Sequence, residues 1–152
     1  MSKLRLLCLL LPVTYAAHID EEYWGGFPGW ASAQTGLAMT ESVFLSLNTF
    51  FFGVMVVGVV AALLAKPAQW VLIPLGTAVL INGAGHLAAS IITRSYSPGL
   101  VTGVLLWIPL GLSIIRAARA IWPKRRVLAG VLTGALLHVL VPLSAWLAAR
   151  GP

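Results

Sequence analysis

The stretch ESVFLSLNTFFFGVMVVGVVAALLA, residues 41–65, decides the fold class of this chain. Glu41 is its only charged residue, and apolar side chains dominate the rest of the stretch. At about 1.5 Å of rise per residue, a helix of this length exceeds the hydrocarbon core of a bilayer, which is about 30 Å thick. The stretch therefore predicts a transmembrane helix.

The composition of the whole chain agrees with this prediction. Hydrophobic residues occupy 59% of the 152 positions and charged residues 9%, and the mean hydropathy is +0.94. Soluble domains carry far more charge, so an integral membrane protein is expected. We predict an all-α bundle of about five transmembrane helices, forming a single domain over residues 1–152, with spans at about 4–23, 41–65, 68–93, 100–121 and 127–149. Short loops separate these spans, and the first of them, residues 25–29, reads as a turn.

The first span is short, because its apolar part, Leu4–Ala17, reaches only about 21 Å as a helix, less than the hydrocarbon core of a bilayer. It could be a cleaved signal peptide, since Lys3 and Arg5 precede the apolar run. Cleavage after Ala17 would place the bulky Tyr15 where a small residue is needed, which favours the alternative. In that alternative the helix continues to residue 23 and draws the acidic residues toward the membrane.

The basic residues indicate an orientation and exclude one class of partner. If the N-terminus is cytoplasmic, eight of the ten Lys and Arg residues lie on that side and two, Arg94 and Arg150, on the other. This asymmetry predicts a cytoplasmic N-terminus and a C-terminus outside. The net charge of +6 is spread over helix ends, so we expect no nucleic-acid binding. The single cysteine, Cys8, excludes an intramolecular disulfide and is expected to pack in the core.

Three of the four acidic residues stand in the run His18-Ile19-Asp20-Glu21-Glu22. On a helix, His18, Glu21 and Glu22 occupy positions i, i+3 and i+4 and project from one side, whereas Asp20 faces away. Ionisable groups at the edge or inside of a membrane are costly and usually functional. This run is the strongest candidate for a site.

The other rare polar side chains map to the middle or outer half of the expected bundle. On the span 68–93, Asn82, His86 and Ser90 follow one another at i+4, and Arg94 continues this stripe at the outer end of the span. Two more polar residues, Asn48 and His138, lie on the spans 41–65 and 127–149. Each also has a structural interpretation, such as a hydrogen bond between helices or a contact of Arg94 with lipid headgroups. Gly130 and Gly134 mark a close-packing face beside His138.

Two kinds of chemistry fit these residues. In the first, a divalent metal, zinc or iron, is bound by His18, Glu22, His86 and His138 and keeps an open position. In the second, no metal is present: Glu21 and Glu22 share a proton, and His86 or His18 exchanges protons with a lipid-like substrate in the bilayer, as in an isomerase or hydrolase. Glu21, Glu22 and His86 are the expected catalytic residues, with Asn48, Asn82 and Arg94 orienting them.

Two classes other than enzymes stay open. Intramembrane His and Glu residues also suit a proton or metal-ion pathway in a transporter or sensor. The sequence has no inverted repeat, so a transporter would need a homodimer to supply its second half. A structural or accessory subunit is the third possibility, in which the polar residues serve only helix packing.

The run His18–Glu22 resembles the signature of the HXXEE family of bacterial membrane proteins. The later pair Asn82 and His86, and the segment Tyr96–Thr102, resemble that family's second block, so the resemblance covers essentially the whole chain. It implies an all-helical domain in the bacterial inner membrane, in which His18, Glu21 and Glu22 belong to the defining motif. It does not supply a substrate.

Overall fold

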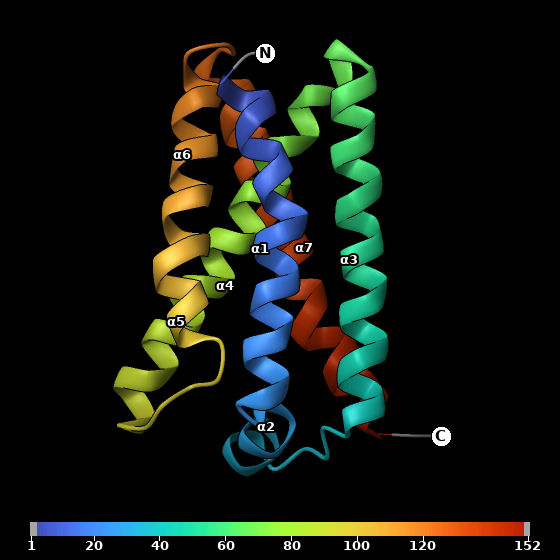
Figure 1. The fold of residues 1–152 in the computed structure, drawn as a ribbon, viewed down its shortest axis with the longest axis vertical. Coiled ribbons are helices and arrows are strands. Elements are labelled where there is room, and N and C mark those ends of the chain that lie inside the picture. The colour runs from blue at the N-terminus through green and yellow to red at the C-terminus, as the bar shows by residue number, and fades with distance from the viewer. Residues whose placement is uncertain (1–2, 151–152) are drawn as a thin grey trace.

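The chain folds into a bundle whose long helices run side by side along one axis (Figure 1). The computed structural model describes residues 3–150, and side chains from residue 4 to residue 147, so the side chains of Lys3 and Arg150 in the charge count lie outside it. Every described element is a helix: α1 (Lys3–Trp24), α2 (Phe27–Thr35), α3 (Glu41–Leu64), η1 (Lys66–Val71), α4 (Leu72–Thr93), α5 (Leu100–Thr102), η2 (Gly103–Trp107), α6 (Ile108–Arg119) and α7 (Lys124–Arg150). The prediction of an all-α bundle is confirmed.

Four helical stretches of the described chain are long and apolar enough to cross a membrane. They are Glu41–Leu64, Lys66–Thr93, Leu100–Arg119 and Lys124–Leu147, and they agree with the last four expected spans to within a few residues. The count differs from five at α1, because Arg5 and the three carboxylates of its last turns give this helix more charge than such a stretch carries.

Helix α1 is nevertheless an integral part of the bundle. It runs without a break over 22 residues, as the longer version of the first span predicted. One face buries Leu4, Cys8 and Leu11 in the core, and another exposes Leu6 and Val13. Cys8 is fully buried, so its expected packing role is confirmed.

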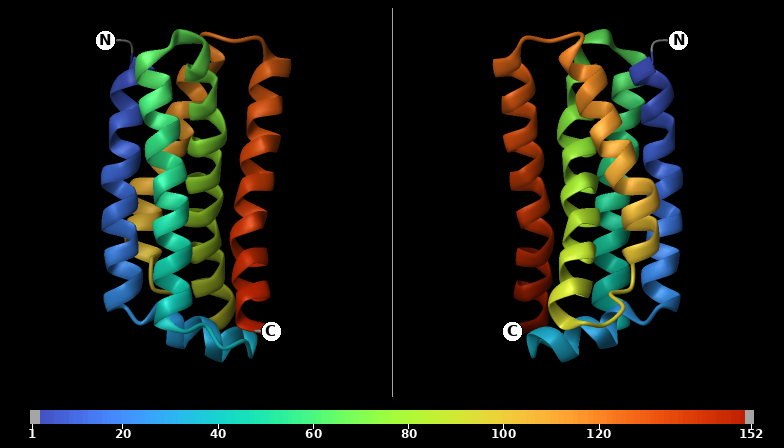
Figure 2. Two further views of the ribbon diagram at one scale, coloured as in Figure 1. Left: turned by 90° about the vertical axis from the view of Figure 1, so that its right-hand side faces the viewer. Right: turned by 90° about the vertical axis from the view of Figure 1, so that its left-hand side faces the viewer.

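Helix α2 was not expected from the sequence, since residues 25–29 read as a turn. Only Gly25 and Gly26 form that turn, with Gly26 in the left-handed region at φ 77, and Phe27 begins the helix. Pro28 lies in the first turn of α2, where its missing N–H costs nothing. Helix α2 lies across the end of the bundle that is remote from the N-terminus (Figure 2).

Helix α4 lies at the centre, packed against both α6 and α7. A Cβ on Gly134 of α7 would lie 2.5 Å from the Pro74 carbonyl oxygen, so the predicted close-packing face is confirmed. On the other side of α4, a Cβ on Gly83 would lie 2.6 Å from the carbonyl oxygen of Gly103. Gly103 begins η2, a π-helical turn that ends at the buried Trp107. Irregular turns of this kind frequently occur beside functional sites.

Candidate functional site

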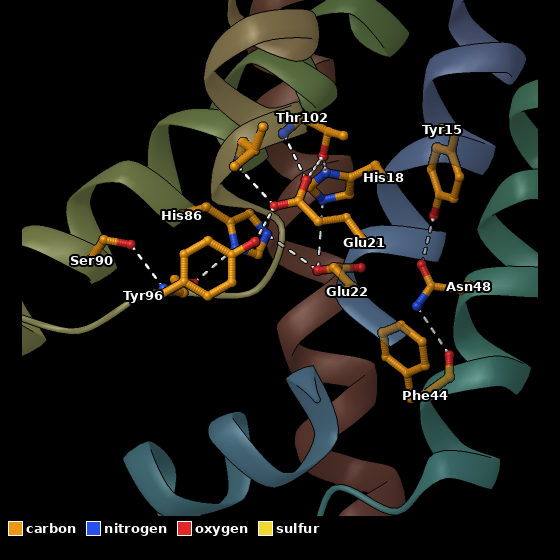
Figure 3. A network of polar contacts seen from close by, with 12 residues as sticks. Tyr15, His18, Glu21, Glu22, Phe44, Asn48, His86, Ser90, Tyr96 and Thr102 are labelled. Atoms are coloured by element: carbon orange, nitrogen blue, oxygen red, sulfur yellow. Dashed lines mark hydrogen bonds and ion pairs between the residues drawn. The ribbon is translucent and has the colours of Figure 1, made fainter. Parts of the chain in front are cut away.

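His18, Glu22 and His86 meet inside the bundle (Figure 3). The Oε1 atom of Glu22 lies 3.2 Å from Nε2 of His86 and 3.6 Å from Nε2 of His18. One potential ligand atom from each residue lies within 4.8 Å of the other two, and all three side chains are buried. The expected proximity of these three residues is confirmed, and we call them the His18–Glu22–His86 cluster.

Each member of the cluster is positioned by its helix. His18 and Glu22 are one turn apart on α1, and His86 faces them from α4. The two imidazole rings meet edge to face, with centroids 5.0 Å apart and an interplanar angle of 74°. Trp107 of η2 stacks on the ring of His18 at 3.7 Å between centroids. No pattern in the sequence indicated this stacking partner.

Both histidines have their second ring nitrogen beside a hydroxyl group. The Nδ1 atom of His18 lies 2.7 Å from Oγ1 of Thr102, and Nδ1 of His86 lies 3.0 Å from Oγ of Ser97. Metal-binding histidines are typically oriented by such contacts on the far side of the ring. The sequence did not predict this role for Thr102 and Ser97, although both lie in the segment 96–102 that resembles the family's second block.

Glu21 is directed away from the cluster. Its carboxylate accepts hydrogen bonds from the Tyr96 hydroxyl at 2.5 Å, from the backbone N–H groups of Val101 and Thr102 at 2.9 and 2.7 Å, and from the Thr102 hydroxyl. These contacts hold the start of α5 against α1, and Glu21 does not line the cavity beside the cluster. The geometry places Glu21 outside the cluster and in contact with the segment 96–102, and the catalytic role expected for it stays a prediction.

Gly99 closes the cluster from the loop between α4 and α5. Its φ of +97 is in the left-handed region, and a Cβ here would lie 2.8 Å from Cε1 of His86 and 2.9 Å from Cε1 of His18. Glycine is therefore required both for the turn and for contact with the two imidazoles. In the sequence this residue reads only as part of a turn.

A cavity of about 600 Å³ adjoins the cluster, which forms part of its wall. Side chains from α1, α2, α3, α4 and α7 line it, together with Trp107 and with Leu37 and Met39 from the segment between α2 and α3. Most of the described lining residues are apolar, none is Lys or Arg, and Glu22 is the one carboxylate among them. A cavity of this volume is large enough to enclose a small molecule.

Three of the other predicted site residues line the cavity, and the fourth, Arg94, does not. His138, Asn48 and Asn82 line the cavity, but His138 is not among the grouped ligands. Asn48 accepts from the Tyr15 hydroxyl at 3.3 Å and donates to the Phe44 carbonyl at 3.1 Å, so its polar atoms serve contacts away from the cluster.

Arg94 lies outside both the cluster and the cavity lining. It is exposed and terminates α4 with a left-handed φ of 52, which turns the chain away from the helix axis. Its expected place beside the ligands is therefore wrong. Ser90, one turn earlier on the predicted stripe, accepts a hydrogen bond from the Ser97 backbone N–H and so holds the loop that carries Ser97.

The donor set fits one divalent metal ion. With bonds of about 2.0–2.1 Å in tetrahedral geometry, neighbouring ligand atoms lie about 3.3 Å apart, close to the observed 3.2 and 3.6 Å. Nε2 of His18 is also buried without a hydrogen-bond partner, as is Oδ1 of Asn82. An unpartnered buried nitrogen facing a carboxylate is the arrangement that a cation would satisfy.

Comparisons with known proteins place the chain in a family. Residues 9–114, which include the run His18–Glu22 and the segment 96–102, match the family model described as "Protein of unknown function with HXXEE motif". The chain is 28% identical over 140 residues to the "Uncharacterized protein YrkK" of Bacillus subtilis (strain 168), covering 83% of this chain and 84% of the relative. No solved structure matches it. The chain belongs to the HXXEE family.

Proposed function

We propose that this protein is a membrane enzyme with one divalent metal ion, bound by His18 Nε2, Glu22 Oε1 and His86 Nε2, and that it acts on a lipid-like substrate. The observation that carries the proposal is the His18–Glu22–His86 cluster in the wall of an apolar cavity. Three protein ligands leave a coordination position open for water or substrate.

The chemistry of the donor set supports zinc or iron(II). Two histidines and one carboxylate occur in catalytic zinc sites and in the facial triads of non-haem iron enzymes. Bound here, the metal supplies a Lewis acid and an activated water beside the cavity. The chain's own residues hold the ligands in place, exclude bulk water through burial and surround an aliphatic substrate with apolar side chains.

Elemental analysis of the protein purified in detergent tests this proposal. We expect one zinc or iron ion per chain in the unaltered protein and almost none in the His18→Ala and His86→Ala variants. His138→Ala is the matched control, because His138 lines the same cavity outside the cluster, and it should keep the metal. Metal retained in His18→Ala and His86→Ala would refute the proposed ligand set.

A second function is favoured by one distance, the 3.2 Å between Nε2 of His86 and Oε1 of Glu22. This separation allows a direct hydrogen bond, so the pair could transfer a proton to and from a lipid-like substrate without a metal. Metal-free protein that still converts membrane lipids, and that loses this activity in Glu22→Gln, would favour acid–base catalysis over the metal enzyme.

A further inference from the structure

We infer that Glu21 and Thr102 act as a positioning relay that fixes the tautomer of His18 with its hydrogen on Nδ1, so that its Nε2 atom presents a lone pair to the cluster. The relay deepens the proposed function, since it prepares one ligand of the same site. It consists of three groups in sequence: the Glu21 carboxylate, the Thr102 hydroxyl and Nδ1 of His18.

The Glu21 carboxylate is surrounded by hydrogen-bond donors. Glu21 receives four hydrogen bonds, two of them from backbone N–H groups that can only donate. An ionised carboxylate has only acceptor positions and suits four donors. The Thr102 hydroxyl has a single hydrogen, and this hydrogen is directed to Oε2 of Glu21.

The Thr102 hydroxyl connects Glu21 to His18. Because its hydrogen is already used, Oγ1 of Thr102 must accept a hydrogen bond in its 2.7 Å contact with Nδ1 of His18. Nδ1 therefore carries the hydrogen of the imidazole. A neutral imidazole carries one N–H, so Nε2 has a lone pair, which faces Oε1 of Glu22 at 3.6 Å and is available to a cation between them.

The two histidines differ in this respect. Ser97, which contacts Nδ1 of His86, makes no contact with a carboxylate among the described side chains. Its hydroxyl is free to donate or accept, so His86 can carry its hydrogen on either nitrogen. His18 is thus prepared for a metal in advance, whereas His86 can carry its hydrogen on Nε2 and donate to Glu22 when no metal is bound, and carry it on Nδ1 and donate to Ser97 when one binds.

The tautomer is measured directly by nitrogen NMR of protein with ¹⁵N-labelled histidine, stripped of metal with a chelator. His18→Gln identifies the His18 signals among the three histidines. We expect a protonated Nδ1 and an unprotonated Nε2 for His18 in the unaltered protein. The opposite tautomer would overturn the inference, whatever the variants do.

Two substitutions then separate the hydroxyl from packing. Thr102→Ser keeps the hydroxyl and should preserve the tautomer, whereas Thr102→Val keeps the shape without the hydroxyl and should abolish the single tautomer. Zn²⁺ affinity, measured by competition with a fluorescent chelator, should fall about 10–100-fold in Thr102→Val and stay close to normal in Thr102→Ser.

Equal losses of affinity in both variants, or no loss in Thr102→Val, would refute the relay. The proposed function fails separately: if the unaltered protein shows the expected tautomer but binds no Zn²⁺, the relay stands and the metal site does not.

Discussion

Replacing Gly99 by alanine should disturb the site through a steric effect that can be estimated from the structure. The added Cβ would lie 2.8 Å from Cε1 of His86 and 2.9 Å from Cε1 of His18, closer than real Cβ contacts occur. The backbone also has φ +97, which costs an L-residue roughly 1–2 kcal/mol. Overpacking of a tight site adds about 1–3 kcal/mol, so the free energy of unfolding should fall by roughly 2–5 kcal/mol.

Gly36→Ala provides the matched control. Gly36 has φ 71 and ψ 6, and Gly99 has φ 97 and ψ −6, so the backbone cost is similar. Nothing lies within 4 Å of a Cβ at Gly36. This control should therefore lose only the backbone contribution of roughly 1–2 kcal/mol and keep its metal affinity.

Denaturant unfolding in detergent and Zn²⁺ competition measure the two effects on the same samples. We expect Gly99→Ala to bind Zn²⁺ at least about tenfold more weakly, because the shifted imidazoles no longer match the ligand spacing of about 3.3 Å. If Gly99→Ala unfolds as easily as predicted but binds Zn²⁺ with unchanged affinity, the two imidazoles do not form the metal site.

Three further predictions concern the contacts around the cluster and the orientation of the chain. Glu21→Gln places an amide NH₂ against hydrogen-bond donors and should lower the free energy of unfolding by about 1–3 kcal/mol, whereas Asp20→Asn, which neutralises an exposed neighbour, should change the unfolding curve little. Burial, and then the hydrogen bond to Glu21, raise the pKa of Tyr96 from 10.0 to about 12, so its contribution to stability should be complete below pH 10 and be lost as the pH rises toward 12. A phenol that ionises near its ordinary pKa in an ultraviolet titration would contradict that contact. Ser95 and Lys124 are both exposed. A cysteine introduced at Ser95 should react with an impermeant maleimide added to intact cells, whereas one introduced at Lys124 should react only when the reagent is given access to the cytoplasmic face. The reverse pattern would refute the orientation expected from the basic residues.

The long helices and two of the three members of the cluster could be predicted from the sequence because they depend on local spacing. Apolar runs of sufficient length define the spans, and His18 and Glu22 at i+4 share a helix face in any context. His86 could be predicted from the sequence for a different reason. An ionisable residue in an otherwise apolar span needs polar partners, and few candidates existed in this chain.

The remaining features depend on how the loop between α4 and α5 packs, which no local pattern reveals. Ser97, Gly99 and Thr102 reach the histidines only because this loop folds back against α1. The position of Arg94 was also hidden from the local pattern. The i+4 stripe predicted it beside the cluster, but a left-handed turn at the end of α4 directs the chain elsewhere. Helix α2 was missed because a glycine pair read as a longer turn.

The adjacent carboxylates of Glu21 and Glu22 illustrate why spacing alone could not assign their roles. Neighbouring residues on a helix point about 100° apart, so Glu21 and Glu22 contact different partners on different sides of α1. Glu22 joins His18 and His86, and Glu21 binds the segment that carries Thr102. His18 contacts both groups, through Nε2 toward Glu22 and through Nδ1 toward Thr102. The histidine and the two glutamates of the motif thus form one unit with the segment 96–102, in which Glu21 holds the loop that contacts Nδ1 of His18 and Glu22 faces its Nε2 atom.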